Sequence, residues 1–81
     1  MREARGRGVA TRALILLSRW AFAELGAARV QLLTEPANRA SQRVAEKAGF
    51  RREALLRAYV ELKGTRRDVY MYALLGVELD A

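Results

Sequence analysis

The first third of the chain carries apolar residues at the spacing of one helical face. Gly26 follows this segment, at the position where a left-handed glycine commonly ends a helix. The pattern predicts a helix over residues 9–25, with Thr11 or a neighbouring residue as its N-cap. The members of the stripe are Ala10, Ala13, Leu14, Leu17, Ala21 and Leu25.

This predicted helix is also apolar outside its main stripe, where Ile15, Leu16, Trp20 and Phe22 lie. A helix that is apolar over most of its circumference needs cover on more than one side. The rest of a short chain can hardly supply that cover, so we expect either a missing segment or a partner. Trp20 is accordingly expected in the core or at an interface.

A short strand and a second helix follow. Residues 29–35 are partly alternating and contain a β-branched residue, and Pro36 closes the segment. Asn38 is a suitable N-cap for a helix that runs to about Ala48, because its side-chain oxygen can accept an unpaired backbone N–H. Gly49 ends that helix, and Phe50 is expected to pack back against its last turn.

The remainder of the chain has β character. Residues 50–62 predict a broken or bulged strand, residues 63–65 a turn, and residues 67–75 a returning strand. The predicted fold is therefore a single partial domain over residues 1–81, of mixed α/β class, in the order loop-α-β-α-β-β. A strand normally precedes the helix of such a unit. Too few residues precede Arg5 for one, so an N-terminal part of the domain is expected to be absent.

Composition narrows the possible chemistry. The net charge is +6, which favours anionic partners, although a solvated arginine-rich surface explains it equally well. The chain has neither cysteine nor histidine, so a thiolate metal site is excluded and a transition-metal site is not expected. No segment reaches the roughly 20 apolar residues that a membrane span needs. A cytoplasmic protein that does not bind membranes fits these features.

Two glycines and two arginines precede the first helical pattern, in the run Arg5-Gly6-Arg7-Gly8-Val9-Ala10. Glycine allows a backbone to approach a ligand closely. The first N–H groups of a helix are unpaired, and the helix dipole favours anions at that end. The run therefore predicts a phosphate-binding loop.

Two motifs carry a resemblance to a known family. The first is a glycine motif matched by Arg5, Gly8 and Ala10. The second begins Asn-x-x-Ser, matched by Asn38 and Ser41, and ends in Lys47, Ala48, Gly49 and Phe50. In this order, around one strand, they resemble the C-terminal half of the GNAT superfamily of acetyl-CoA-dependent N-acyltransferases. Within it, the sequence looks most like the branch that acetylates the N-termini of ribosomal proteins. The resemblance covers nearly all of the chain.

The resemblance implies direct transfer of an acetyl group from acetyl-CoA to a primary amine, for example a protein N-terminus or a small-molecule amine. A tyrosine that donates a proton in many members is replaced here by Ala45. In the ribosomal branch Ser41 would take that role, and its alternative is a helix-surface or cofactor-contacting hydroxyl. Asn38 can bind the pantetheine arm, cap the helix, or do both. The cofactor-binding residues implied are Arg5, Gly6, Arg7, Gly8, Val9, Ala10, Thr11, Asn38 and Ser41.

Three alternatives stay open at this point. The chain is expected to lack the half of the domain that holds the substrate cleft, so it can instead be a non-catalytic half-domain that binds coenzyme A or self-associates. A strand edge without a partner strand favours a homo-oligomer, and so does a helix with more apolar surface than the chain can cover. Nucleic-acid binding rests on charge alone and is not favoured. The pairs Arg51-Arg52 and Arg66-Arg67 can attract an acidic substrate or simply be solvated.

Overall fold

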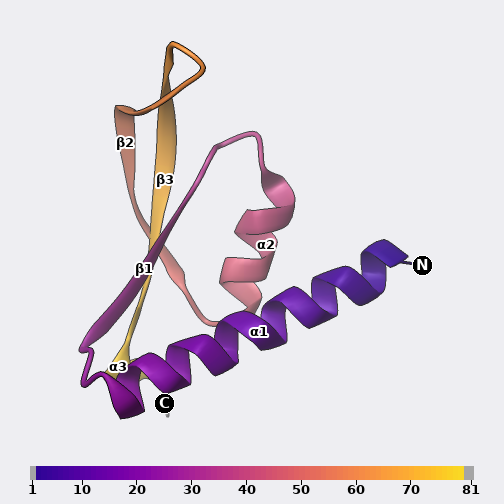
Figure 1. Cartoon of the computed structure of the whole chain (residues 1–81), viewed down its shortest axis with the longest axis vertical. Coiled ribbons are helices and arrows are strands. Elements are labelled where there is room, and N and C mark those ends of the chain that lie inside the picture. Colours follow the sequence, from indigo (N-terminus) through magenta and orange to yellow (C-terminus); the bar gives the residue numbers. More distant parts are fainter. Residues whose placement is uncertain (1, 80–81) are drawn as a thin grey trace.

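A computed structural model describes residues 2–79 of the chain, with side chains from Gly8 onward. Figure 1 shows two main helices on one side of a small twisted sheet. The mixed α/β class and the order of the main elements confirm the prediction, and a short C-terminal helix was not predicted. The elements are α1 (Arg2–Glu24), β1 (Arg29–Thr34), α2 (Arg39–Lys47), β2 (Arg51–Leu62), β3 (Thr65–Leu75) and α3 (Gly76–Leu79).

The sheet is three-stranded and antiparallel, with β3 between β1 and β2. In this register Leu32 of β1 lies opposite Tyr72 of β3. Because side chains alternate along a strand, both point to the same face, where the helices lie. The buried core gathers there and consists of Ala45, Ala48, Phe50, Tyr72 and Leu74.

The first helix begins earlier than predicted. Residues 5–8, expected as a loop, are helical, and Thr11 lies inside α1 rather than at its cap. Arginine, glutamate and alanine are good helix formers, and they fill most of the first turn. Each glycine costs only about 1 kcal/mol relative to alanine in a helix, which is too little to stop it. The loop prediction is therefore wrong for this structure.

The face that α1 packs against the core is also rotated from the predicted stripe. Leu17 and Leu25 were expected inside, but they are 57% and 65% exposed. The side chains that pack on the core are Leu14, Ile15 and Phe22. The prediction is thus right for Leu14 and wrong for Leu17 and Leu25. The helix is apolar nearly all round, so periodicity alone could not select the inner face.

The opposite face of α1 remains uncovered by the residues that the structure describes. Val9, Leu16 and Trp20 follow the i, i+7, i+11 spacing of a single stripe and are each more than half exposed. We call these three residues the outer stripe. Trp20 is thus not in the core, and the prediction that the helix has more apolar surface than this chain covers is confirmed.

Helix α2 ends in a backbone motif that the sequence predicted. Gly49 has φ +96°, a left-handed value that favours glycine. Its N–H donates to the Glu46 carbonyl (3.0 Å), and the N–H of Phe50 donates to the Ala45 carbonyl (2.9 Å). This pair of bonds is a Schellman C-cap, and it turns the Phe50 side chain into the core beside Ala45.

The predicted irregularity of β2 is confirmed as two register shifts against β3. The larger one, between Leu56 and Val60, contains Ala58 with φ +49°. Both backbone groups of Ala58 are held by side chains from β3. Its N–H donates to Asp68 Oδ1 (2.8 Å), and its carbonyl accepts from Arg66 Nη2 (2.6 Å).

We expect Ala58→Gly to raise the free energy of unfolding by about 0.5–1 kcal/mol, because glycine adopts positive φ without the strain of a Cβ atom. Urea denaturation followed by circular dichroism measures this change. The control Ala54→Gly, at a position of β2 that pairs with Met71 of β3, should instead lower stability. Destabilisation by Ala58→Gly would show that the strain is not there.

An ion pair spans the face of the sheet that lies away from the helices. Arg29 of β1 donates to Glu53 of β2 through Nη2 (2.6 Å to Oε1) and Nη1 (3.2 Å to Oε2). Since β3 runs between these strands, the pair crosses over it, near Ala73. Ala73 is only 1% exposed although neither main helix covers this face. The hydrogen bond with Arg29 lowers the pKa of Glu53 below its usual value.

Candidate functional site

The start of α2 holds the predicted pair Asn38 and Ser41. Asn38 Oδ1 accepts a hydrogen bond from the backbone N–H of Ser41 (3.1 Å), which confirms the predicted N-cap. The Ser41 side chain is half-buried in the first turn. Within the described residues, Ser41 Oγ and Asn38 Nδ2 have no hydrogen-bond partner. A hydroxyl and an amide donor are thus available together at the end of a helix that favours negative charge.

A third polar group without a partner lies just before this turn. Thr34, the last residue of β1, is 6% exposed, and its Oγ1 has no hydrogen-bond partner among the described residues. Leaving such a buried group unpaired costs about 1–3 kcal/mol. The loop between Thr34 and α2 is fixed by Gln42, whose Nε2 donates to the Pro36 carbonyl (2.8 Å). At this end of the sheet, Thr34 Oγ1, Ser41 Oγ and Asn38 Nδ2 can therefore each form a hydrogen bond that no described residue supplies.

The predicted phosphate loop lies elsewhere. Residues 5–11 are within α1, so the N–H groups of Gly8, Val9 and Ala10 bond to carbonyls of the preceding turn. In Figure 1 the N-terminal end of α1 projects past α2, and α2 begins at its end away from α1. The structure therefore brings Asn38 and Ser41 together but does not bring residues 5–11 to them.

A buried tyrosine lies under α2. Tyr72 is fully buried, and its hydroxyl donates to Glu46 Oε2 (3.4 Å). Burial, and next the negative charge of Glu46, raise the pKa of Tyr72 above its ordinary value. Its hydroxyl therefore stays protonated near neutral pH, and its ring is part of the buried core.

This raised pKa makes stability depend on alkaline pH. The unfolded chain loses the Tyr72 proton near pH 10 while the folded chain keeps it, so the unfolded state binds fewer protons and stability falls as pH rises above about 10. We expect Tyr72→Phe to flatten that fall, and the exposed Tyr59→Phe to leave it unchanged. Urea midpoints between pH 8 and 11 measure the effect. An equal fall in the Tyr72→Phe variant would contradict it.

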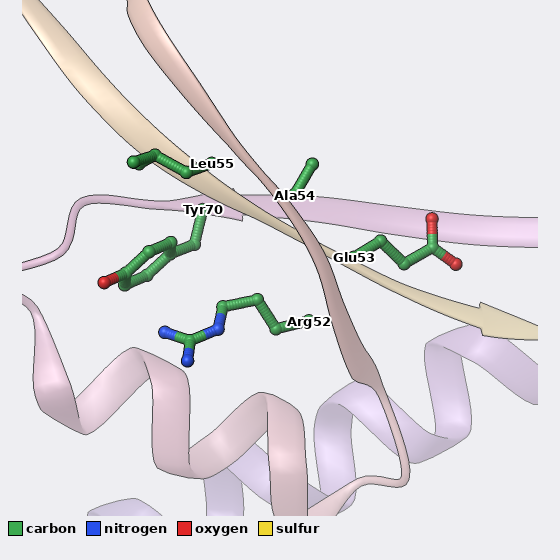
Figure 2. Close-up of a pocket in the computed structure, with 5 residues that line it drawn as sticks. All are labelled: Arg52, Glu53, Ala54, Leu55 and Tyr70. Atoms are coloured by element: carbon green, nitrogen blue, oxygen red, sulfur yellow. The ribbon is translucent and has the colours of Figure 1, made fainter.

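An open pocket of about 300 Å³ lies on β2 and β3, lined by Arg52, Glu53, Ala54, Leu55 and Tyr70. The Arg52 guanidinium carbon lies 4.2 Å from the centre of the Tyr70 ring, a cation–π contact. Figure 2 shows the guanidinium and the Tyr70 hydroxyl reaching toward α2, while the Glu53 carboxylate points the other way.

Arg52 differs from the other sheet arginines that the sequence grouped with it. Arg51 pairs with Glu78 (3.6 Å), Arg66 with Glu61 (3.9 Å) and Arg67 with Glu35 (3.2 Å). Arg52 has no carboxylate partner among the described residues. The sequence marked it only as half of an arginine pair. Its place beside Tyr70 depends on the register shift after Arg52; the sequence predicted an irregular strand here but not where the shift falls.

Two classes of site are not found in the described part of the chain. No cluster of three or more potential metal-ligating side chains occurs in residues that the structure describes. Within those same residues, no helix is both long and apolar enough to cross a membrane.

Comparison with known proteins gives consistent matches. The family model described as an acetyltransferase (GNAT) domain matches residues 1–51. A probable N-acetyltransferase, YjcK, from Bacillus subtilis (strain 168) is 39% identical over 71 residues, which are 88% of this chain and 39% of that protein. An uncharacterized N-acetyltransferase, p20, from Bacillus licheniformis is 37% identical over 73 residues, which are 90% of this chain and 41% of that protein.

A solved structure agrees with both sequence matches. Mycobacterium smegmatis RimJ, in complex with CoA-disulfide, superposes with a TM-score of 0.86 at 34% identity. The match covers 91% of this chain and 35% of that one. The chain thus spans about two fifths of the length of its curated relatives. It belongs to the GNAT family of acetyltransferases.

Proposed function

We propose that this chain contributes to an acetyl-CoA-dependent N-acetyltransferase that moves an acetyl group directly to a primary amine. The observation that carries the proposal is the start of α2, where Ser41 Oγ and Asn38 Nδ2 are uncommitted within the described residues and lie one helical turn apart. The RimJ neighbour, solved with CoA-disulfide, supports coenzyme A as the ligand of this fold.

Acetyl-CoA supplies the acetyl group as a thioester. The amine nitrogen attacks the thioester carbonyl, a carbon–nitrogen bond forms, and the carbon–sulfur bond breaks. The amine gives up a proton to water, and the departing thiolate takes one up. In this proposal Ser41 donates that proton through Oγ and regains one from water. Asn38 uses its oxygen to hold the Ser41 backbone and its Nδ2 to bind the pantetheine arm. The chain has no cysteine to carry an acetyl group, so transfer is direct.

We further propose that residues 5–11 bind the pyrophosphate of coenzyme A: Arg5, Gly6, Arg7, Gly8, Val9, Ala10 and Thr11. Their N–H groups are paired within α1, so binding requires the residues up to and including Gly8 to leave the helix. The new helix end would then present free N–H groups to the anion. Gly6 and Gly8 lower the cost of this change because glycine is a poor helix former.

A single substitution tests this requirement. We expect Gly8→Ala to stabilise α1 by about 1 kcal/mol, since an added Cβ meets nothing within 4 Å. If binding needs this segment unwound, acetyl-CoA affinity falls about fivefold, the ratio that corresponds to about 1 kcal/mol. Isothermal titration calorimetry measures the affinity, and thiol release in the presence of a primary amine measures transfer.

The control Ala23→Gly, at an exposed position far along α1, should lower stability and leave the affinity unchanged. Unchanged affinity in Gly8→Ala would overturn the unwinding step. The absence of acetyl-CoA binding would overturn the proposed function itself.

A second candidate is a non-catalytic half-domain that binds coenzyme A or self-associates. The exposed outer stripe of Val9, Leu16 and Trp20 favours it, because apolar surface of this kind commonly marks an interaction site. Strand β1 also pairs only with β3 within the described residues, which leaves its other edge open. Acetyl transfer by the 81-residue chain alone would exclude this candidate.

A further inference from the structure

We propose that the pocket on β2 and β3 binds a carboxylate on the amine acceptor, with Arg52 as its anchor. This inference rests on the proposed function and adds an acceptor class to it: amines that carry a carboxylate, such as peptides with an acidic N-terminal residue or an acidic amino acid.

The Tyr70 ring holds the guanidinium of Arg52 in place. Arg52 and Tyr70 lie on neighbouring strands, and the guanidinium carbon stands 4.2 Å from the ring centre. Stacking occupies a face of the planar guanidinium and leaves its N–H edges available. Those edges match the two oxygens of a carboxylate, so a stacked arginine is suited to bidentate binding. A lysine in the same place would keep the charge but lose this match.

No carboxylate of the described residues forms an ion pair with Arg52. Glu53 lines the pocket, but its carboxylate is bound by Arg29 on the opposite face of the sheet. Figure 2 shows the Arg52 and Glu53 side chains pointing in different directions from β2. Arg51, Arg66 and Arg67, by contrast, each pair with a carboxylate. An incoming carboxylate therefore displaces no internal ion pair when it reaches Arg52.

The size and lining of the pocket restrict its ligand. A volume of about 300 Å³ lies at the lower end of small-molecule sites and suits one amino-acid side chain. Its lining combines one cation with a phenol ring and an aliphatic side chain, Leu55. A polyphosphate or a nucleic-acid backbone would need several cations. One carboxylate on a short aliphatic stem fits this lining better.

The pocket also opens on the side of the sheet where α2 lies. Arg52 and Tyr70 reach toward α2, the helix that carries Ser41 in its first turn. An acceptor anchored at Arg52 by its carboxylate would therefore have its amine held close to that helix. Fixing one end of an acceptor in this way lowers the entropic barrier to attack by the other end.

Binding and transfer are measured separately on matched acceptors. The probes are Glu-Ala-Ala amide and Gln-Ala-Ala amide, with free glutamate and glutamine as a second pair. Calorimetry gives the affinity, and thiol release from acetyl-CoA gives kcat/KM. We expect both the affinity and kcat/KM to be about tenfold higher for Glu-Ala-Ala amide than for Gln-Ala-Ala amide. One pair of charge-assisted hydrogen bonds accounts for a ratio of about this size. Arg52→Gln should equalise the two peptides, and Arg52→Lys should restore only part of the preference.

Arg57→Gln is the matched control, because Arg57 is exposed on the same strand and does not line the pocket. It should leave the preference unchanged. Equal binding of both peptides by the parent protein, or an equal loss in Arg57→Gln, would overturn the inference. Transfer without a charge preference overturns the inference and leaves the proposed function standing. A charge preference in binding without transfer to any amine supports the carboxylate site and overturns the proposed function. A preference seen only with the free amino acids assigns the site to a small molecule.

Discussion

Phe50→Ala is expected to lower the free energy of unfolding by about 3–5 kcal/mol, the usual cost of removing a buried phenylalanine ring. Phe50 is 3% exposed and belongs to the core cluster that joins α2 to β3. A domain of this size has a total stability of about 4–12 kcal/mol, at about 0.05–0.15 kcal/mol per residue. The substitution therefore removes a large share of the total stability. It also removes the side-chain contact that packs α2 against the sheet.

Urea denaturation followed by circular dichroism measures this loss. The backbone bond from Phe50 to the Ala45 carbonyl remains possible in the variant, so the change isolates the side chain. Leu55→Ala is the matched control, because Leu55 is half exposed on β2 and should cost much less. Similar losses for both variants would show that Phe50 is not a central contact of the core.

Ser41→Ala is expected to lower kcat for acetyl transfer about 100-fold or more, the usual contribution of a positioned proton donor. Its backbone N–H still donates to Asn38, so the cap of α2 and the fold should persist. Because Ser41 acts on the departing thiolate in this proposal, KM for the amine should change little. Steady-state kinetics with a range of amine concentrations separates kcat from KM.

Two further variants make this result specific. Ser41→Thr keeps a hydroxyl and should recover part of the lost rate. Arg43→Ala, at an exposed position of α2, should leave kcat unchanged. An unchanged kcat in Ser41→Ala would leave Ser41 with a binding or surface role instead.

The elements that sequence predicted best have local signals at their ends. Asn38 and Gly49 bracket α2, and each makes the backbone contact that its residue type favours. The hairpin was equally accessible, because residues 63–65 break two β-rich segments. The family motif at Asn38 and Ser41 falls on these same well-marked positions. Local chemistry therefore predicted most of the order of elements and the cap geometry at Asn38 and Ser41.

The rest depended on features without a local signal. The inner face of α1 was only partly predicted: Leu17 fits the main stripe but is exposed, whereas Ile15 lies outside that stripe and packs on the core, a difference that only tertiary packing decides. The start of α1 was misplaced since glycine weakens a helix without ending it. The pocket of Arg52 and Tyr70 depends on strand register, which a bulge shifts by an amount that composition does not specify.

The ion pair across β3 has a mechanical consequence. Arg29 and Glu53 link the two outer strands, so a force that pulls β2 away from the sheet is shared with β1. Ala73 lies on the strand that this link crosses, and its small side chain is almost fully buried. A longer side chain there would push the two charged groups apart. Both charged side chains are 37% exposed, so this link adds only weakly to the backbone hydrogen bonds that join β1 and β2 to β3.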